Sequence, residues 1–136
     1  MENTLILWPM LVQISLSVVI LFWLAWSRLS RVAKLGMTEI QKTGFPKHVN
    51  NASDNFKNQF ELPVLFYALV LFFVVTGGVT QPVLITAWVF IIARVLHALV
   101  HLTKNVVFPY RFIAFFISAL AILTMTVLAI LHLVAL

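Results

Sequence analysis

Long apolar segments without charged residues constrain this chain more than any other feature. No acidic or basic side chain lies between Glu61 and Arg94, and both ends of the chain contain further apolar stretches. A helix of about 20 apolar residues crosses the hydrocarbon core of a bilayer. Only 10% of the 136 residues are charged, whereas soluble domains carry about a quarter. The sequence therefore predicts an integral membrane protein.

Four membrane spans account for these segments. The polar segment 28–53 separates the first two spans and is expected to be a cytoplasmic loop, with room for a short interfacial helix. The expected fold is a single all-α domain over residues 1–136, a transmembrane bundle of four helices. The expected spans lie at about 5–27, 54–75, 83–104 and 111–135.

The basic residues flank the apolar segments. The formal net charge is +5, but this placement is typical of membrane topology and not of nucleic-acid binding. Segment 28–53 holds most of the Lys and Arg residues, and Lys104 and Arg111 lie between the last two spans. The positive-inside rule then places both basic connections in the cytoplasm and both termini on the non-cytoplasmic side. We expect a multi-pass protein of the cell (inner) membrane.

The chain contains no cysteine. This excludes a disulfide framework, a thiolate metal site and a cysteine nucleophile, so any thiol chemistry must come from a ligand. The N-terminal segment MENTLILWPM also lacks the basic region that begins a secretory signal peptide. Its apolar run is therefore expected to remain as the first span.

A group of polar residues precedes the second apolar run. Asn55, Asn58 and Glu61 recur every three residues, so they share one face of a helix. An acidic group costs about 2.5–3.5 kcal/mol at the bilayer centre and usually has a partner. Glu61 is therefore a candidate binding residue, or it lies at the headgroup level and pairs with Lys57.

Pro63 adds a second feature to this stretch. Because proline has no N–H, the carbonyl of Gln59 would lack its helical partner. Such a kink can open a polar pocket, although prolines are also ordinary in membrane helices.

A second polar group lies on the third apolar run. Arg94, His97, His101 and Lys104 follow one another at helical spacing and form a single stripe. Two histidines four residues apart could chelate a metal, but no third standard ligand lies nearby and basic neighbours would repel a cation. We therefore expect no metal. The stripe is interpreted as a row of donors that face an anionic partner, either Glu61 or an anionic ligand.

Basic residues also begin the fourth span and end the first. Arg111 closes the segment FPYR, where its charge and the positive end of the last helix would stabilise an anion or a thiolate. Alternatively, Arg111 is a positive-inside arginine that reaches the interface. Arg28, Arg31 and Lys34 follow the first span at helical spacing, as basic flanks do after any span.

The order of these motifs resembles the MAPEG family, the membrane-associated proteins of eicosanoid and glutathione metabolism. The segment NQFELPVLF resembles the family's Asn-x-x-Glu motif, followed closely by proline, on helix 2. The segment RVLHALVHLTK is similar to the Arg-x-x-His pattern of helix 3, and the later PYR to the arginine that begins helix 4. The resemblance extends over nearly the whole chain in span order and length.

The resemblance implies a homotrimer that binds glutathione between subunits, near the cytoplasmic side. It implies that Asn58 and Glu61 bind the glutathione peptide. Arg111 matches the arginine that stabilises the glutathione thiolate, and it is the implied catalytic residue. A cleft facing membrane lipid would supply a lipophilic small molecule. The other implied binding residues are Arg28, Arg31, Lys57, Arg94, His97 and His101.

Several residues depart from the family pattern, among them Lys57 in place of an arginine and His101 in place of a tyrosine. Asp54 stands where family enzymes have arginine, and Phe112 and Phe115 replace a serine and a tyrosine. The resemblance implies a glutathione-dependent transferase or peroxidase for lipophilic electrophiles or lipid hydroperoxides. Because fold does not determine activity, the alternatives are a non-catalytic lipid-binding protein of the same fold, and a bundle in which a Glu61–Arg94 pair only holds helices together.

Overall fold

The computed structural model consists of helices and short connections, and it describes residues 2–103 and 107–136. Lys104, the last member of the expected stripe and of the expected span 83–104, lies outside these residues. No strand occurs among the described residues. In chain order the elements are α1 (Glu2–Leu5), α2 (Leu7–Leu35), α3 (Met37–Thr43), α4 (Lys47–Asn58), α5 (Leu62–Thr76), α6 (Gln81–Thr103), the π-helical turn η1 (Val107–Arg111) and α7 (Phe112–Val134).

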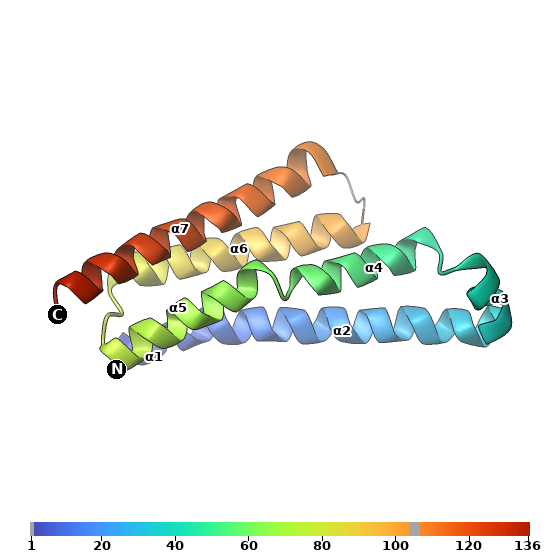
Figure 1. Ribbon diagram of the computed structural model, residues 1–136, viewed down its shortest axis with the longest axis horizontal. Helices are drawn as coiled ribbons and strands as arrows, with labels where there is room; N and C mark the ends of the chain where they lie inside the picture. The colour runs from blue at the N-terminus through green and yellow to red at the C-terminus, as the bar shows by residue number, and fades with distance from the viewer. Residues whose placement is uncertain (1, 104–106) are drawn as a thin grey trace.

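The described residues contain four segments that are long and apolar enough to cross a membrane. They confirm the prediction of an all-α membrane protein with four spans. Figure 1 shows both termini at one end of the bundle and α3 at the other, as four successive crossings require. The candidate spans are Asn3–Leu35, Lys47–Thr76, Gln81–Thr103 and Pro109–Val134.

Segment 28–53 differs from the expected loop because most of it is helical. Helix α2 continues to Leu35, and α3 and α4 occupy much of the remainder. Gly36 and Gly44, with φ of 77° and 76°, separate these helices, because glycine adopts a positive φ at little cost. The basic residues of this segment therefore lie on helical turns and not on an irregular loop.

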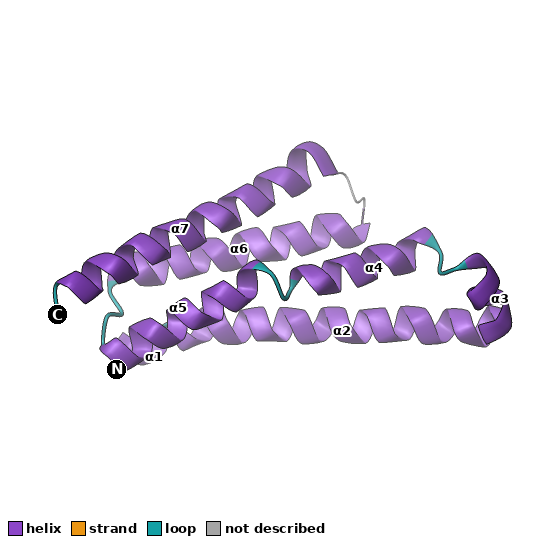
Figure 2. Cartoon of the chain, in the orientation of Figure 1, coloured by secondary structure: helices purple, strands orange, loops and turns teal. Residues whose placement is uncertain are grey.

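The second span is interrupted where α4 ends at Asn58 and α5 begins at Leu62. Pro63 lies in the first turn of α5 and has no N–H, so the carbonyl of Gln59 has no helical donor. Glu61 takes φ −95° and ψ −104°, outside the helical region. Figure 2 shows the interruption as a loop between the two helices, midway along the molecule. The sequence predicted a kink at this proline, whereas the structure has a full break in the helix.

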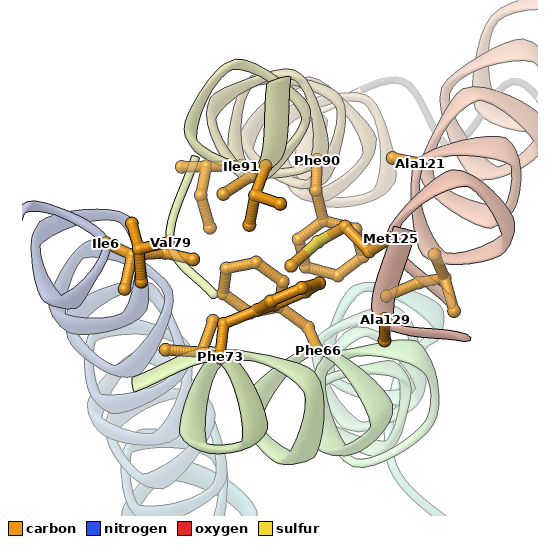
Figure 3. Packing of buried hydrophobic residues seen from close by; sticks show 13 residues of the cluster. Ile6, Phe66, Phe73, Val79, Phe90, Ile91, Ala121, Met125 and Ala129 are labelled. Atoms are coloured by element: carbon orange, nitrogen blue, oxygen red, sulfur yellow. The ribbon is translucent and has the colours of Figure 1, made fainter. Parts of the chain in front are cut away.

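Two apolar clusters form the core. In the larger one, the rings of Phe66 and Phe90 stack with centroids 4.5 Å apart and planes at 15°. Figure 3 shows these rings among side chains from the N-terminal segment, α6 and α7. A smaller cluster joins α2 to α4 nearer the α3 end, through Leu24, Val49 and Ala52. The larger cluster comprises Ile6, Phe66, Val70, Phe73, Val79, Val83, Ala87, Phe90, Ile91, Ala121, Ile122, Met125 and Ala129.

A buried polar layer lies between the two clusters. It comprises Gln13 on α2, Asn55 and Gln59 at the end of α4, and Arg94 and His97 on α6. Along α2, Gln13 lies between Met10, which packs against the larger cluster, and Leu24 of the smaller one. Along α6, His97 lies between Ile91 of the larger cluster and Leu102, which packs against the smaller one. All five side chains are at most 3% exposed. Because polar groups at membrane depth are costly without partners, this layer demands the most specific contacts of the fold.

The turn between α5 and α6 packs closely against His132. The His132 Nε2–H donates to the carbonyl of Thr76 at 3.3 Å and satisfies an acceptor at the end of α5. A Cβ on Gly78 would lie 2.5 Å from His132 Cδ2. We therefore expect Gly78→Ala to displace the imidazole and lower the free energy of unfolding by about 1–3 kcal/mol. Thermal unfolding in detergent measures this loss.

The matched control for this prediction is Gly78→Ala in a His132→Ala background. There the added methyl group meets no imidazole, so it should cost little further stability. An equal loss in both backgrounds would contradict the role assigned to His132.

Candidate functional site

The break between α4 and α5, helix α6 and the start of α7 surround a pocket of about 280 Å³, called the site pocket below. It brings together four residues that the sequence singled out and adds two phenylalanines. A cavity of about 260 Å³ near the termini has no ionisable residue in its lining, so it is a weaker candidate for chemistry. The site pocket is lined by Asn58, Glu61, His97, Arg111, Phe112 and Phe115.

Arg94 holds the end of α4. Its Nη2 donates to the carbonyl of Asn58 at 2.8 Å. In an unbroken helix this carbonyl would accept from the N–H of Leu62, but the break removes that donor. The guanidinium is attracted to the negative end of the helix dipole. In place of a full anionic partner, Arg94 therefore contacts the partial negative charge of the backbone carbonyl at the C-terminal end of α4.

His97 joins the two sides of the site pocket. Its Nδ1 lies 3.3 Å from the carbonyl of Arg111, and its Nε2 lies 3.4 Å from Nδ2 of Asn58. A carbonyl can only accept, so Nδ1 carries the proton and Nε2 accepts from the amide of Asn58. One neutral imidazole tautomer thus satisfies both contacts. Within the described residues no donor contacts the amide oxygen of Asn58, which leaves it available to a ligand.

Arg111 supplies the positive charge of the site pocket. It ends η1 and immediately precedes α7, so its guanidinium and the positive helix end act in the same direction. On the same helix, Phe112 and Phe115 form an apolar side, with the ring of Phe115 6.3 Å from that of His97. The pocket therefore combines an anion-stabilising charge, a polar side and an apolar side.

Glu61 lines the pocket as an exposed carboxylate. Between residues that the structure describes, no ion pair joins it to Lys57 or to Arg94. Because α4 ends at Asn58, Glu61 does not lie one turn beyond Lys57 on a continuous helix. The pairing with Lys57 expected for a merely interfacial Glu61 is therefore not formed. The charge of Glu61 still attracts the guanidinium of Arg94, although these two described residues form no direct ion pair.

Lys57 lies outside the site pocket. Its ammonium pairs with the carboxylate of Asp54 at 3.5 Å, and both side chains are mostly exposed. The acidic charge that departs from the family pattern therefore meets a lysine one turn away and does not line the pocket.

The remaining candidates also lie away from the site pocket. Arg28 donates to Oγ of Ser53 at 3.2 Å, and Arg31 lies about one turn further along α2. His101 is 1% exposed and its ring lies 6.0 Å from that of His97. Neither of its ring nitrogens has a hydrogen-bond partner in the described part of the chain.

No group of three His, Cys, Asp or Glu residues that could hold a metal occurs in ranges 2–103 and 107–136.

Gln13 and Gln59 are buried amide side chains that the sequence analysis did not single out as candidates. Gln13 Nε2 donates to Gln59 Oε1 at 2.9 Å, across a separation of 46 residues. A signal was present, because Gln13 is the only amide side chain in the first apolar run and polar residues inside spans are usually functional or paired.

A comparison with protein-family models matches residues 6–131 to the MAPEG family. The chain belongs to the MAPEG family. The match extends into all four candidate spans and confirms the resemblance seen in the motifs. MAPEG proteins are in general membrane helix bundles of glutathione-related transferase or peroxidase type, which use glutathione as a substrate and form trimers. Searches of the curated proteins and of the solved structures gave no match.

The His97–Asn58 contact of this MAPEG protein can be measured by a double-mutant cycle. His97→Phe and Asn58→Leu each remove the contact, so the loss in the double variant should be smaller than the sum of the single losses. We expect a coupling free energy of about 0.5–1.5 kcal/mol, measured by thermal unfolding in detergent. His48→Phe, at an exposed histidine, is the matched control, and its effect should add to that of Asn58→Leu. Simple additivity in both cycles would show that the contact is energetically silent.

Proposed function

We propose that this protein is a membrane glutathione-dependent transferase or peroxidase that acts on lipophilic electrophiles or lipid hydroperoxides. The observation that carries the proposal is the site pocket, which Asn58, Glu61 and His97 line together with Arg111. Membership in a family that generally uses glutathione supports the same ligand.

The polar side of the site pocket suits the glutathione peptide. Glu61 would pair with the ammonium group of the ligand, and the amide oxygen of Asn58 would accept from a peptide N–H. His97 orients that amide through its own contacts to Asn58 and Arg111. These three residues would bind and orient glutathione before any chemistry begins.

The catalytic role falls to Arg111. A thiol ionises near pH 8.5, and its thiolate is the nucleophile, so a nearby guanidinium and a positive helix end favour the reactive form. In a transfer reaction, the thiolate sulfur forms a bond to the electrophilic carbon while the leaving group departs with its electron pair. With a hydroperoxide, the thiolate attacks the outer oxygen, the O–O bond breaks and the alkoxide collects a proton. A second glutathione then condenses with the resulting sulfenic acid to give the disulfide and water.

The remaining residues that the family resemblance implies for glutathione binding could reach the ligand only in an oligomer. Arg28, Arg31 and Lys57 do not line the site pocket of their own chain, so they would contact glutathione across a subunit boundary. Arg94 and His101 would support the ligand from behind His97. We therefore propose a homotrimer with glutathione between subunits, in keeping with the trimers that the family generally forms.

A second function is favoured by the apolar side of the pocket. Phe112 and Phe115 are 54% and 39% exposed and offer no hydroxyl to a reacting group. A protein that binds membrane lipid without chemistry would use the same surface. Calorimetry with glutathione separates the two functions: heat of binding supports the transferase, whereas no heat together with a co-purified lipid supports the binding protein.

Arg111→Ala tests the catalytic assignment. We expect it to lower the conjugation rate by at least about 100-fold, the usual loss when an electrostatic stabiliser is removed, while the trimer stays intact by size-exclusion chromatography with light scattering. Lys34→Ala, a change of an exposed basic residue outside the proposed site, is the control and should keep its rate. Conjugation retained in Arg111→Ala would disprove the mechanism.

The proposed orientation places α3 in the cytoplasm and both termini on the non-cytoplasmic side. Because the chain has no cysteine, single cysteines report this without background. We expect an impermeant maleimide to label Thr80→Cys in intact spheroplasts, and to label Gln41→Cys only after permeabilisation. Both positions are exposed and lie at opposite ends of the bundle. The reverse labelling pattern would invert the proposed topology.

A further inference from the structure

Three amide side chains form a continuous hydrogen-bonded chain through the buried polar layer. Gln13 Nε2 donates to Gln59 Oε1 at 2.9 Å. Gln59 Nε2 donates to the carbonyl and to Oδ1 of Asn55, at 3.1 and 3.2 Å. Asn55 Nδ2 donates to the carbonyl of Ala98 at 3.2 Å. This set, called the amide chain below, comprises Gln13, Gln59 and Asn55 and connects α2 to α4 and α6.

The amide chain lies at a depth where packing alone would not call for it. Its three side chains are 0 to 1% exposed, and apolar side chains of similar size would fill the same space. Buried amides cost stability, but their hydrogen bonds have direction and can fix helix register. Gln13 donates from α2 to the end of α4 and Asn55 donates from α4 to α6, so the three helices are held in one relative rotation. The amide chain is therefore better explained as a device that fixes helix register than as a contribution to the stability of the fold.

The register that it fixes is that of the broken helix. Gln59 follows Asn58 directly. The carbonyl of Gln59 has no helical donor, because residue 63 is a proline and lacks an N–H. At this point the backbone makes only two tighter bonds, from Gln59 N–H to the carbonyl of Phe56 and from Phe60 N–H to that of Lys57, so side chains add to what holds the end of α4. A slip of one residue would rotate Asn58 by about 100° about the helix axis and take it away from His97.

We propose that the residues of the amide chain are positioning residues for the glutathione side of the site pocket. They hold the end of α4 so that Asn58 meets His97 and Glu61 enters the pocket. None of the three lines the site pocket, so they act through Asn58 and Glu61. The kinetic consequence rests on the proposed function, whereas the structural role does not.

Kinetics distinguish this role from a general effect on folding. Asn58 and Glu61 belong to the binding side, while Arg111 is held by η1 and α7, which the amide chain does not contact. Loss of the amide chain should therefore raise KM for glutathione and change kcat little. A protein that is merely less stable would lose active molecules, which lowers the apparent kcat and leaves KM unchanged.

Gln13→Met and Gln59→Met test the proposal, singly and together, because methionine keeps the length of glutamine and removes its hydrogen bonds. We expect KM for glutathione to rise by about five- to tenfold, the effect of roughly one buried hydrogen bond, with kcat within about twofold. The double variant should be no worse than the poorer single variant, because both break the same chain. Gln81→Met, at an exposed glutamine on α6, is the matched control and should behave as wild type.

Hydrogen exchange without glutathione supplies an independent readout. Peptides from the last turn of α4 should exchange at least about tenfold faster in either variant, while those from α7 stay as in wild type. Unchanged exchange at the end of α4 in both variants would overturn the proposal, as would a fall in kcat at constant KM. If Gln59→Met does not fold, Gln13→Met decides, since it removes only the terminal donor. If wild type does not bind glutathione but exchange accelerates as expected, the proposed function fails and the positioning role is supported.

Discussion

The interruption of the second span at residues 59–61 is the constraint on which the rest of the structure depends. Inside a bilayer, every backbone group that leaves a helix needs another partner. Arg94 meets this need for the carbonyl of Asn58, and this contact joins α6 to the end of α4. A buried arginine in an otherwise apolar helix is thereby explained by backbone geometry. Part of the polar layer follows from the same break, because Arg94 and the side chain of Gln59 donate to the carbonyls of Asn58 and Asn55, which a continuous helix would have paired.

The site pocket arises where this break meets the start of the last helix. His97 connects the two, because one imidazole contacts the amide of Asn58 and the carbonyl of Arg111. The resulting pocket has a polar side and an apolar side, and Arg111 supplies its positive charge. Such a site suits a reaction between a polar thiol ligand and a partner that arrives from the lipid. Membership in the MAPEG family is in accord with this arrangement.

The departures from the family pattern differ in their consequences. Asp54 reverses a charge, but it pairs with Lys57 on the outer surface of α4 and does not reach the pocket. Phe112 and Phe115 do line the pocket, so they change its chemistry directly. Neither phenylalanine can donate a hydrogen bond, so in the proposed mechanism the stabilisation of a reacting group falls to Arg111. The apolar side thus bears on the choice of substrate more than the acidic residue does.

The sequence by itself determined the membrane class, the four spans and the family, because hydropathy and short motifs are properties of neighbouring residues. It also singled out Asn58, Glu61, His97 and Arg111, whose side chains the fold brings into one pocket. Only the tertiary structure decided which groups make direct contacts: the sequence offered Glu61 as a partner of Arg94, and the broken helix supplied the carbonyl of Asn58 as its hydrogen-bond acceptor. The contact of Gln13 with Gln59 was likewise beyond sequence reasoning. Pairing depends on distances set by the break and by helix rotation, and neither is encoded in local spacing.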